Sequence, residues 1–393
     1  MNNNETTPEK LWSISFIYIL FVNTINSSAF GMSIPMVPGY AVNIGATLSF
    51  AGVLTGVFSF VALLGRPIAG IIGDRLNKKR LLAISLFLNG FSVTLYAIAP
   101  GLIWLLPVRI LHGLMFSVSG TVCISLGSTY IPQKRLGEGV GYLGLGQIIG
   151  MALGPNIGIY LRQFFSYKFC FLLCGIAIMI AGISMTALRY EHTAQEFPDN
   201  GSKRAFSFQD IIAVELLPNI FFTAVLAVGY GLNISYIVML GSVRNIDNIG
   251  FYFIVNSVFL LAARPLLGRM TDRKGVVYAI IPGYLMAGIA MVLIGFSDRL
   301  LPVIIAAVLA AAGFGAFPAF QADCLKKLGS SRRTVATGAY FIGMDSGIGV
   351  GQIFGGILAD SFGFNMVYSS AAILMLAGIG LYMLYHKKQT RLH

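Results

Sequence analysis

The stretch G-R-P-I-A-G-I-I-G-D-R-L-N-K-K-R occupies residues 65–80 and follows an apolar run. Part of it, Arg-Pro-x-x-Gly-x-x-x-Asp-Arg, occurs at residues 66–75 and again at residues 264–273. The two copies are offset by 198 residues, about half of the 393-residue chain. A repeat at this distance predicts two fused copies of one structural unit.

The composition is that of an integral membrane protein. Hydrophobic residues make up 56% of the chain and charged residues 11%, which leaves too few polar side chains to cover a soluble protein of this size. Apolar runs of about 20 residues recur along the chain, the length that crosses a hydrocarbon core about 30 Å thick. The first run, residues 11–29, lacks a small-residue cleavage site after it, so we expect a first span rather than a signal peptide.

We therefore expect an all-α membrane protein with twelve transmembrane helices in two pseudo-symmetric six-helix bundles. The predicted spans are residues 11–36, 48–73, 81–99, 102–126, 139–163, 169–189, 211–240, 248–271, 277–296, 300–324, 334–361 and 366–386. The long polar segment at residues 190–210 has no apolar period and is the predicted linker between an N-terminal bundle, residues 1–189, and a C-terminal bundle, residues 211–393.

The net charge of +12 comes from basic residues in short loops between spans, not from one domain face. It therefore indicates membrane orientation and not nucleic-acid binding. Most of these residues fall on the side of the termini, and the opposite side holds Arg162, Lys168, Arg244 and Arg299. This bias predicts a multi-pass protein of the cell membrane with both termini and the linker in the cytoplasm. The four cysteines lie in or beside apolar runs, where we expect packing rather than a disulfide or a metal site.

A second pair of stretches repeats at an offset of 197 residues. Each holds four glycines at spacings of nine, four and four: Gly141, Gly150, Gly154 and Gly158 are matched by Gly338, Gly347, Gly351 and Gly355. The last three of each set advance by about 40° per step and form a stripe for close helix packing. Pro155 removes a backbone hydrogen bond and is expected to bend its helix.

These residues resemble the major facilitator superfamily of secondary transporters over essentially the whole chain. The stretch Gly70-x-x-x-Asp74-Arg75-x-Asn77-x-Lys79-Arg80 is similar to the signature loop between helices two and three, with Asn77 where glycine is usual. In helix four, Arg109-x-x-His112-Gly113 resembles a second motif, with His112 in place of glutamine. Asparagine tolerates left-handed backbone, so the first departure is mild.

The glycines of helix five are similar to the motif of drug and metabolite antiporters that export, except that Ile159 replaces the last glycine. The resemblance therefore implies the proton-coupled multidrug exporter branch. As physics alone, the same stripe is equally consistent with ordinary packing of small residues.

The duplicated turn is the predicted gate. Its members are Gly70, Asp74 and Arg75 in the first copy and Gly268, Asp272 and Arg273 in the second. An aspartate directed at a helix N-terminus is stabilised by typically ~0.3 to 1 kcal/mol, and the resemblance implies that the partner is the helix beginning near Thr334. A contact made in one transporter state only would act as a latch. The alternative is that these charges merely fix topology. Only the first copy keeps a basic cluster, so we expect Asp74 to be the stronger gate.

Asp345 is the predicted proton-coupling residue because it lies near the middle of a span, where a charged side chain costs at least about 2.5 to 3.5 kcal/mol. The alternative is a structural partner for an arginine. The resemblance implies a role in proton handling for Arg109, and His112 can titrate near neutral pH, although a histidine in a helix is often a satisfied hydrogen-bonding residue.

Polar and aromatic residues at helical spacing on four spans are the candidates for a substrate cavity: Asn23, Asn26, Tyr230, Asn233, Phe317, Gln321 and Gln352. Together they suit a bulky, partly apolar substrate. An aromatic stripe is more often packing than part of a pocket.

We expect a bacterial, monomeric transporter that exchanges protons for drug-like or amphipathic molecules by alternating access, without cofactor or metal. The partners are then a small-molecule substrate, protons and the lipid bilayer. The alternative is an importer or exporter of a specific metabolite or sugar. An intramembrane enzyme would need a nucleophile with its base, or a metal motif such as HExxH, and the sequence holds neither. A receptor that no longer transports would not need Asp74, Arg109 and Asp345.

Overall fold

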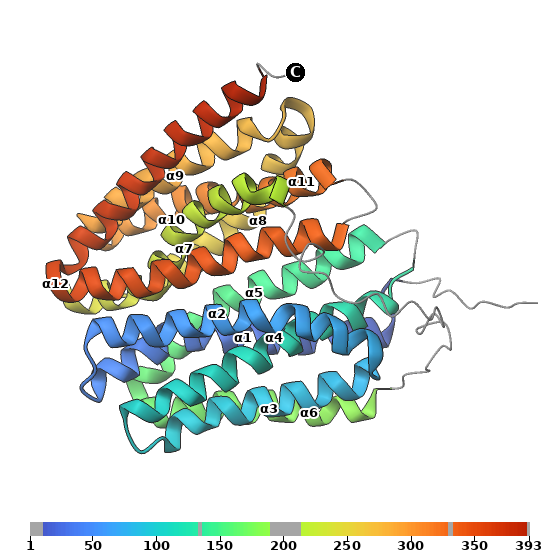
Figure 1. Ribbon diagram of the computed structural model, residues 1–393. Coiled ribbons are helices and arrows are strands. Elements are labelled where there is room, and N and C mark those ends of the chain that lie inside the picture. Colours follow the sequence, from blue (N-terminus) through green and yellow to red (C-terminus); the bar gives the residue numbers. More distant parts are fainter. Residues whose placement is uncertain (1–10, 133–135, 189–213, 329–332, 391–393) are drawn as a thin grey trace, which may run out of the picture. The chain divides into compact units, whose positions relative to one another are not determined.

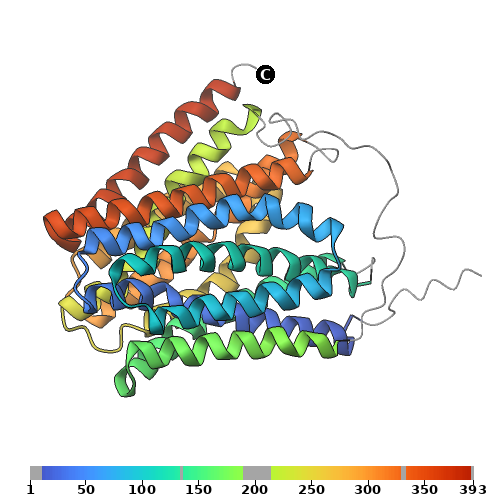
Figure 2. The same ribbon diagram turned by 60° about the horizontal axis from the view of Figure 1, so that its bottom comes forward.

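A computed structural model describes residues 11–132, 136–188, 214–328 and 333–390. The described chain is helical, joined by short turns (Figures 1 and 2). The helices are α1 (Ile14–Asn43), α2 (Leu48–Arg75), α3 (Lys78–Ile98), α4 (Leu105–Thr129), α5 (Leu136–Phe164), α6 (Tyr167–Ser184), α7 (Leu217–Val243), α8 (Phe251–Lys274), α9 (Val277–Gly295), α10 (Leu300–Phe314), α11 (Phe317–Leu328) and α12 (Arg333–Thr390). Four of the described helices begin at a capping side chain: Ser13, Thr47, Asn77 and Ser166 accept the N–H groups of Phe16, Phe50, Arg80 and Phe169.

Ten helical stretches of the described chain are long and apolar enough to cross a membrane. A multi-pass, all-helical architecture follows, but the exact count of twelve spans is not confirmed. The predicted spans 334–361 and 366–386 both lie in α12, which consists of two helical segments that meet at Gly363, where φ is 77° and the backbone is not helical (Figure 1). The predicted tenth span is divided between α10 and α11, and α5 is not among the ten stretches.

The chain forms two compact units. One contains residues 1–33 and 64–202, and the other contains residues 34–63 and 203–393. Helices α1 and α2 thus each contribute to both units. The predicted linker, residues 190–210, lies outside the described residues. The division into two bundles at this linker and its location in the cytoplasm therefore stay predictions.

The glycines that repeat in the sequence make equivalent helix-packing contacts in the two units. In the first unit, a Cβ atom at Gly150 would lie 2.6 Å from Cβ of Ser27, and one at Gly154 would lie 2.9 Å from the carbonyl carbon of Gly31. In the second unit, Gly347 meets Ala224 and Gly351 meets Val228 in the same way. Every residue number in the second set is larger by 197. The two duplicated stripes therefore make equivalent contacts, α5 with α1 and α12 with α7.

In the second unit, α12 also packs closely against residues 48–63 of α2. A Cβ atom at Gly52 would lie 2.6 Å from the Gln352 carbonyl oxygen, and one at Gly56 would lie 2.8 Å from that of Gly349. Gln352 links the helices further: its Oε1 accepts a 3.0 Å hydrogen bond from Ser59, and its Nε2 donates one of 3.0 Å to Ser235 of α7. The first part of α12 is thus held by α7 and by α2.

Asp360 ends this contact by capping α2. Its carboxylate accepts the backbone N–H groups of Leu48 and Ser49, both at 3.1 Å, and the Ser49 hydroxyl at 2.6 Å. Helix N-termini carry unsatisfied N–H groups and partial positive charge. The local sequence supplies part of the cap, because the Thr47 hydroxyl accepts the N–H of Phe50 at 3.1 Å. A carboxylate more than 300 residues away in the chain supplies the rest.

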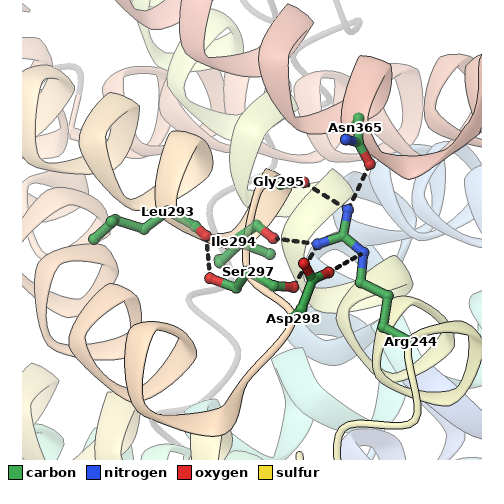
Figure 3. A network of polar contacts seen from close by, with 7 residues as sticks. All are labelled: Arg244, Leu293, Ile294, Gly295, Ser297, Asp298 and Asn365. Atoms are coloured by element: carbon green, nitrogen blue, oxygen red, sulfur yellow. Dashed lines mark hydrogen bonds and ion pairs between the residues drawn. The ribbon is translucent and has the colours of Figure 1, made fainter.

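Arg244 makes the corresponding contact at helix C-termini (Figure 3). It follows the last residue of α7, and its guanidinium donates hydrogen bonds to the carbonyl oxygens of Gly295 at 2.6 Å and Ser297 at 2.5 Å. It also donates to Oδ1 of Asn365 in α12 at 2.5 Å. One cation thus satisfies carbonyl groups at the end of α9 and ties that end to α7 and α12.

We predict that Gly154→Ala destabilises the protein by about 1 to 3 kcal/mol, because the added methyl group would overlap with the α1 backbone. The matched control is Gly144→Ala on the same helix, where no described atom lies within 4 Å of the new Cβ. Gly351→Ala and its control Gly338→Ala repeat the test in the second unit. Thermal unfolding in detergent measures all four, and equal effects within a pair would contradict the role assigned to packing.

We also predict that Asp360→Asn weakens the contact between α2 and α12 by about 1 kcal/mol or less, since the lost cap is exposed to solvent. Ser49→Ala should cost less in an Asp360→Asn background than in the native protein, because the hydroxyl then has lost its charged acceptor. Thermal unfolding of the two single variants and the double variant gives the coupling. Asp247→Asn, an exposed carboxylate in a loop, is the control; strict additivity of the first two changes would argue against the cap.

Candidate functional site

The predicted cavity residues of α1 are buried and bonded. Nδ2 of Asn23 donates to the Leu143 carbonyl oxygen of α5 at 3.0 Å. Oδ1 of Asn26 accepts a 2.9 Å hydrogen bond from Asn89 of α3, and its Nδ2 lies 3.5 Å from the Ser119 hydroxyl of α4. In this structure both side chains join helices of the first unit. Their role in a substrate cavity stays a prediction.

Asn89 is a residue that the sequence interpretation did not select. It is 1% exposed, and its Oδ1 has no hydrogen-bond partner among the described atoms. The available signal was a polar stripe on α3, since Ser85, Asn89, Ser92 and Tyr96 recur at helical spacing and are all buried. Helix α3 therefore presents a polar face to the interior of the first unit.

Arg109 and His112 lie together on α4, as their spacing predicts. Nη1 of Arg109 is 3.4 Å from Nδ1 of His112, and the hydroxyl of Tyr96 is 3.3 Å from the same nitrogen. Arg109 is 2% and His112 1% exposed. A guanidinium and an imidazole buried within a span are costly and mark a functional site by default. Tyr96 joins them from α3, although no motif in the sequence pointed to it.

Asp345 lies on α12 in the second unit and is 6% exposed. The glycines on either side of it pack against α7: Cβ atoms at Gly343 and Gly347 would overlap with backbone around Ile220 and Ala224. The helix thus holds the carboxylate at a fixed height beside α7. Gln352, seven residues later, is 5% exposed and fully engaged with Ser59 and Ser235, so in this structure its amide serves helix packing.

The aromatic candidates form one cluster in the second unit. The ring of Tyr230 lies 5.2 Å from that of Phe314 and 5.8 Å from that of Phe317, both in edge-to-face contact. Asn233, one turn further along α7, donates a short hydrogen bond to the hydroxyl of Tyr252 on α8. Tyr230 is partly exposed, whereas Phe314 and Phe317 are buried. The cluster is therefore mainly packing, with one accessible ring. Gln321, a turn later on α11, is also partly exposed.

The gating residues are described only in part. Nothing is described of the side chains of Asp74, Arg75 and Asp272, nor of the surroundings of Gly141, so the latch stays a prediction. At Gly70 and Gly268 an added Cβ atom would have no described atom within 4 Å, and Arg273 is exposed at the end of α8. In the helix-five motif, Gly150, Gly154, Pro155 and Gly158 are all buried.

Within the described ranges, no group of three or more histidine, cysteine or acidic residues could hold a metal ion. The four cysteines are buried free thiols. The site therefore consists of polar and ionisable side chains inside helices, without a described metal-binding cluster.

Comparisons with known proteins give a consistent result. The family model of the Major Facilitator Superfamily matches residues 19–351 and 248–392. An uncharacterised MFS-type transporter of Methanocaldococcus jannaschii is 22% identical over 93% of this chain and 97% of its own. The multi-drug resistance efflux pump PmrA of Streptococcus pneumoniae is 26% identical over 44% of each chain.

Among solved structures, the nucleoside transporter NupG in a mutant form has a TM-score of 0.80 with 12% sequence identity, covering 94% of this chain and 99% of its own. At this identity the likeness concerns the fold alone. It agrees with the all-helical architecture described above. The chain belongs to the Major Facilitator Superfamily and is a multi-pass membrane transporter, not an enzyme.

Proposed function

We propose that this transporter exports drug-like or amphipathic small molecules in exchange for protons, by alternating access. The observation that carries the proposal is Asp345, a carboxylate that is 6% exposed in the middle of a membrane-spanning helix. An ionised carboxylate is costly at this depth, which makes Asp345 a candidate for taking up a proton. Taking up a proton on one side and releasing it on the other is the behaviour that coupling needs.

Three further features support the proposal. The glycines and Pro155 of α5 resemble the antiporter motif and make the close contact with α1 that such a motif requires. The partial similarity to PmrA, which is named as an efflux pump, favours the same direction. Arg109, His112 and Tyr96 form a second buried polar group, and the family resemblance implies a role in proton handling for Arg109.

The proposed gates lie at opposite ends of α2. Asp74 is the penultimate residue of the helix, and Asp360 binds its first two residues. In the proposed cycle the Asp360 contact holds one end while the predicted Asp74 latch is released, and the order is reversed in the other state. Each carboxylate thereby stabilises one state through a helix N-terminus.

Asp345→Asn is expected to abolish substrate-driven proton movement while leaving binding of a neutral substrate in place. The measurement uses proteoliposomes with an imposed pH gradient and a screen of lipophilic cations, anions and neutral amphipathic molecules, with proton efflux followed by a trapped dye. Asp247→Asn serves as the control because this carboxylate is exposed in a loop. Unchanged proton coupling in Asp345→Asn would refute the assignment.

Asp74→Asn should slow turnover by destabilising one state, with a free-energy effect of ~0.3 to 1 kcal/mol or more if the contact is shielded. Asp272→Asn is the matched variant in the second copy and should have the smaller effect. Initial rates of uptake into inverted vesicles and the labelling rate of a cysteine introduced at Ala46 report the two consequences. If Asp272→Asn slows turnover more than Asp74→Asn does, the predicted asymmetry is wrong.

A further inference from the structure

Arg264 is an ionised side chain inside a membrane-spanning helix that the mechanism above does not use. It lies on α8 within the apolar stretch Phe251–Thr271 and is exposed. Across residues 11–132, 136–188, 214–328 and 333–390, no hydrogen bond or ion pair of its guanidinium is found. Arg109, the buried arginine of α4, by contrast has a partner in His112.

An arginine in this position needs a counter-charge. Placing a guanidinium in a span costs about 2.5 to 3.5 kcal/mol on insertion scales, and such residues mark substrate or ion pathways by default. Guanidinium groups bind carboxylates and phosphates through two parallel hydrogen bonds. An anion that comes from outside the described protein would satisfy this side chain.

The packing of α8 places Arg264 beside the aromatic cluster. Leu267, one turn after Arg264 on the same face of α8, lies 2.9 Å from the position of a Cβ atom at Gly315. Gly315 lies between Phe314 and Phe317, whose rings are stacked with centroids 6.2 Å apart. Arg264 also acts electrostatically on Tyr230 of α7, whose ring contacts both phenylalanines.

We propose that Arg264 and the partly exposed face of Tyr230 bind an amphipathic anion: the guanidinium pairs with a carboxylate, sulfonate or phosphate, and the aromatic or apolar body rests on the Tyr230 ring. The inference rests on the proposed function and narrows its substrate class from amphipathic molecules in general to amphipathic anions. Two sources share this chemistry, a carried substrate and the headgroup of an anionic lipid.

The test is equilibrium binding of radiolabelled 2-naphthoate and of its neutral analogue 2-naphthamide to the full-length protein in zwitterionic lipid nanodiscs, without any gradient. We expect the native protein to prefer naphthoate. Loss of a charge-assisted hydrogen bond should make Arg264→Gln bind naphthoate roughly ten- to a hundred-fold more weakly, with naphthamide unchanged. Arg264→Lys should restore part of the affinity because it keeps the charge without the bidentate geometry.

Arg269→Gln is the matched control, because Arg269 is exposed on the same helix but about 140° around it. It should bind naphthoate as the native protein does. Thermal unfolding of each variant checks that the fold is retained. Equal affinity for naphthoate and naphthamide in the native protein, or unchanged naphthoate binding in Arg264→Gln, would overturn the inference.

A second arm adds phosphatidylglycerol to the nanodiscs and measures whether it competes with naphthoate. Competition in the native protein assigns the site to lipid headgroups as well as to soluble anions, whereas absence of competition assigns it to soluble anions. Proteoliposome flux separates this inference from the proposed function. Charge-selective binding without proton-coupled flux would support the anion site and refute the proposed function. Proton-coupled flux without a preference for anions would support the proposed function and refute the anion site.

Discussion

Close approach of helix backbones at small residues is the constraint on which both units depend. In a bilayer the lipid tails are as apolar as a leucine side chain, so burial of apolar surface does little to bring helices together. Association relies on packing and on hydrogen bonds between helices. Gly150 and Gly154 in one unit, and Gly347 and Gly351 in the other, remove the side chains that would keep α1 from α5 and α7 from α12.

The polar side chains follow from the same constraint. Hydrogen-bonding groups inside a span must find partners within the protein, and Asn23, Asn26 and Gln352 do so by joining neighbouring helices. Against this background Arg264 is unusual because its charge is exposed within a span. Asp345 is buried instead, and it is flanked by glycines that fix its helix against α7. Asp345 and Arg264 therefore have different surroundings, which suits different tasks.

Hydropathy and internal repeats were sufficient to predict the helical membrane fold and the equivalence of the two glycine stripes. The gap between the predicted spans 334–361 and 366–386 contains Gly363, whose left-handed backbone interrupts α12. The role of Gln352 could not be predicted from the sequence. A polar residue that lines a cavity and one that donates a hydrogen bond to a neighbouring helix have the same spacing in the sequence. Asp360 could not be found because it caps a helix more than 300 residues away.

Helices α1 and α2 pass from one compact unit to the other, after Ser33 and after Leu63. Both carry proline just beyond the crossing, at Pro35 and Pro38 in α1 and at Pro67 in α2. Proline has no N–H, so the carbonyl four residues earlier loses its helical hydrogen bond; for Pro67 that carbonyl belongs to Leu63 itself. Each helix therefore bends most easily close to the residue at which it passes from one unit to the other. Bending there breaks fewer backbone hydrogen bonds than bending elsewhere along the helix.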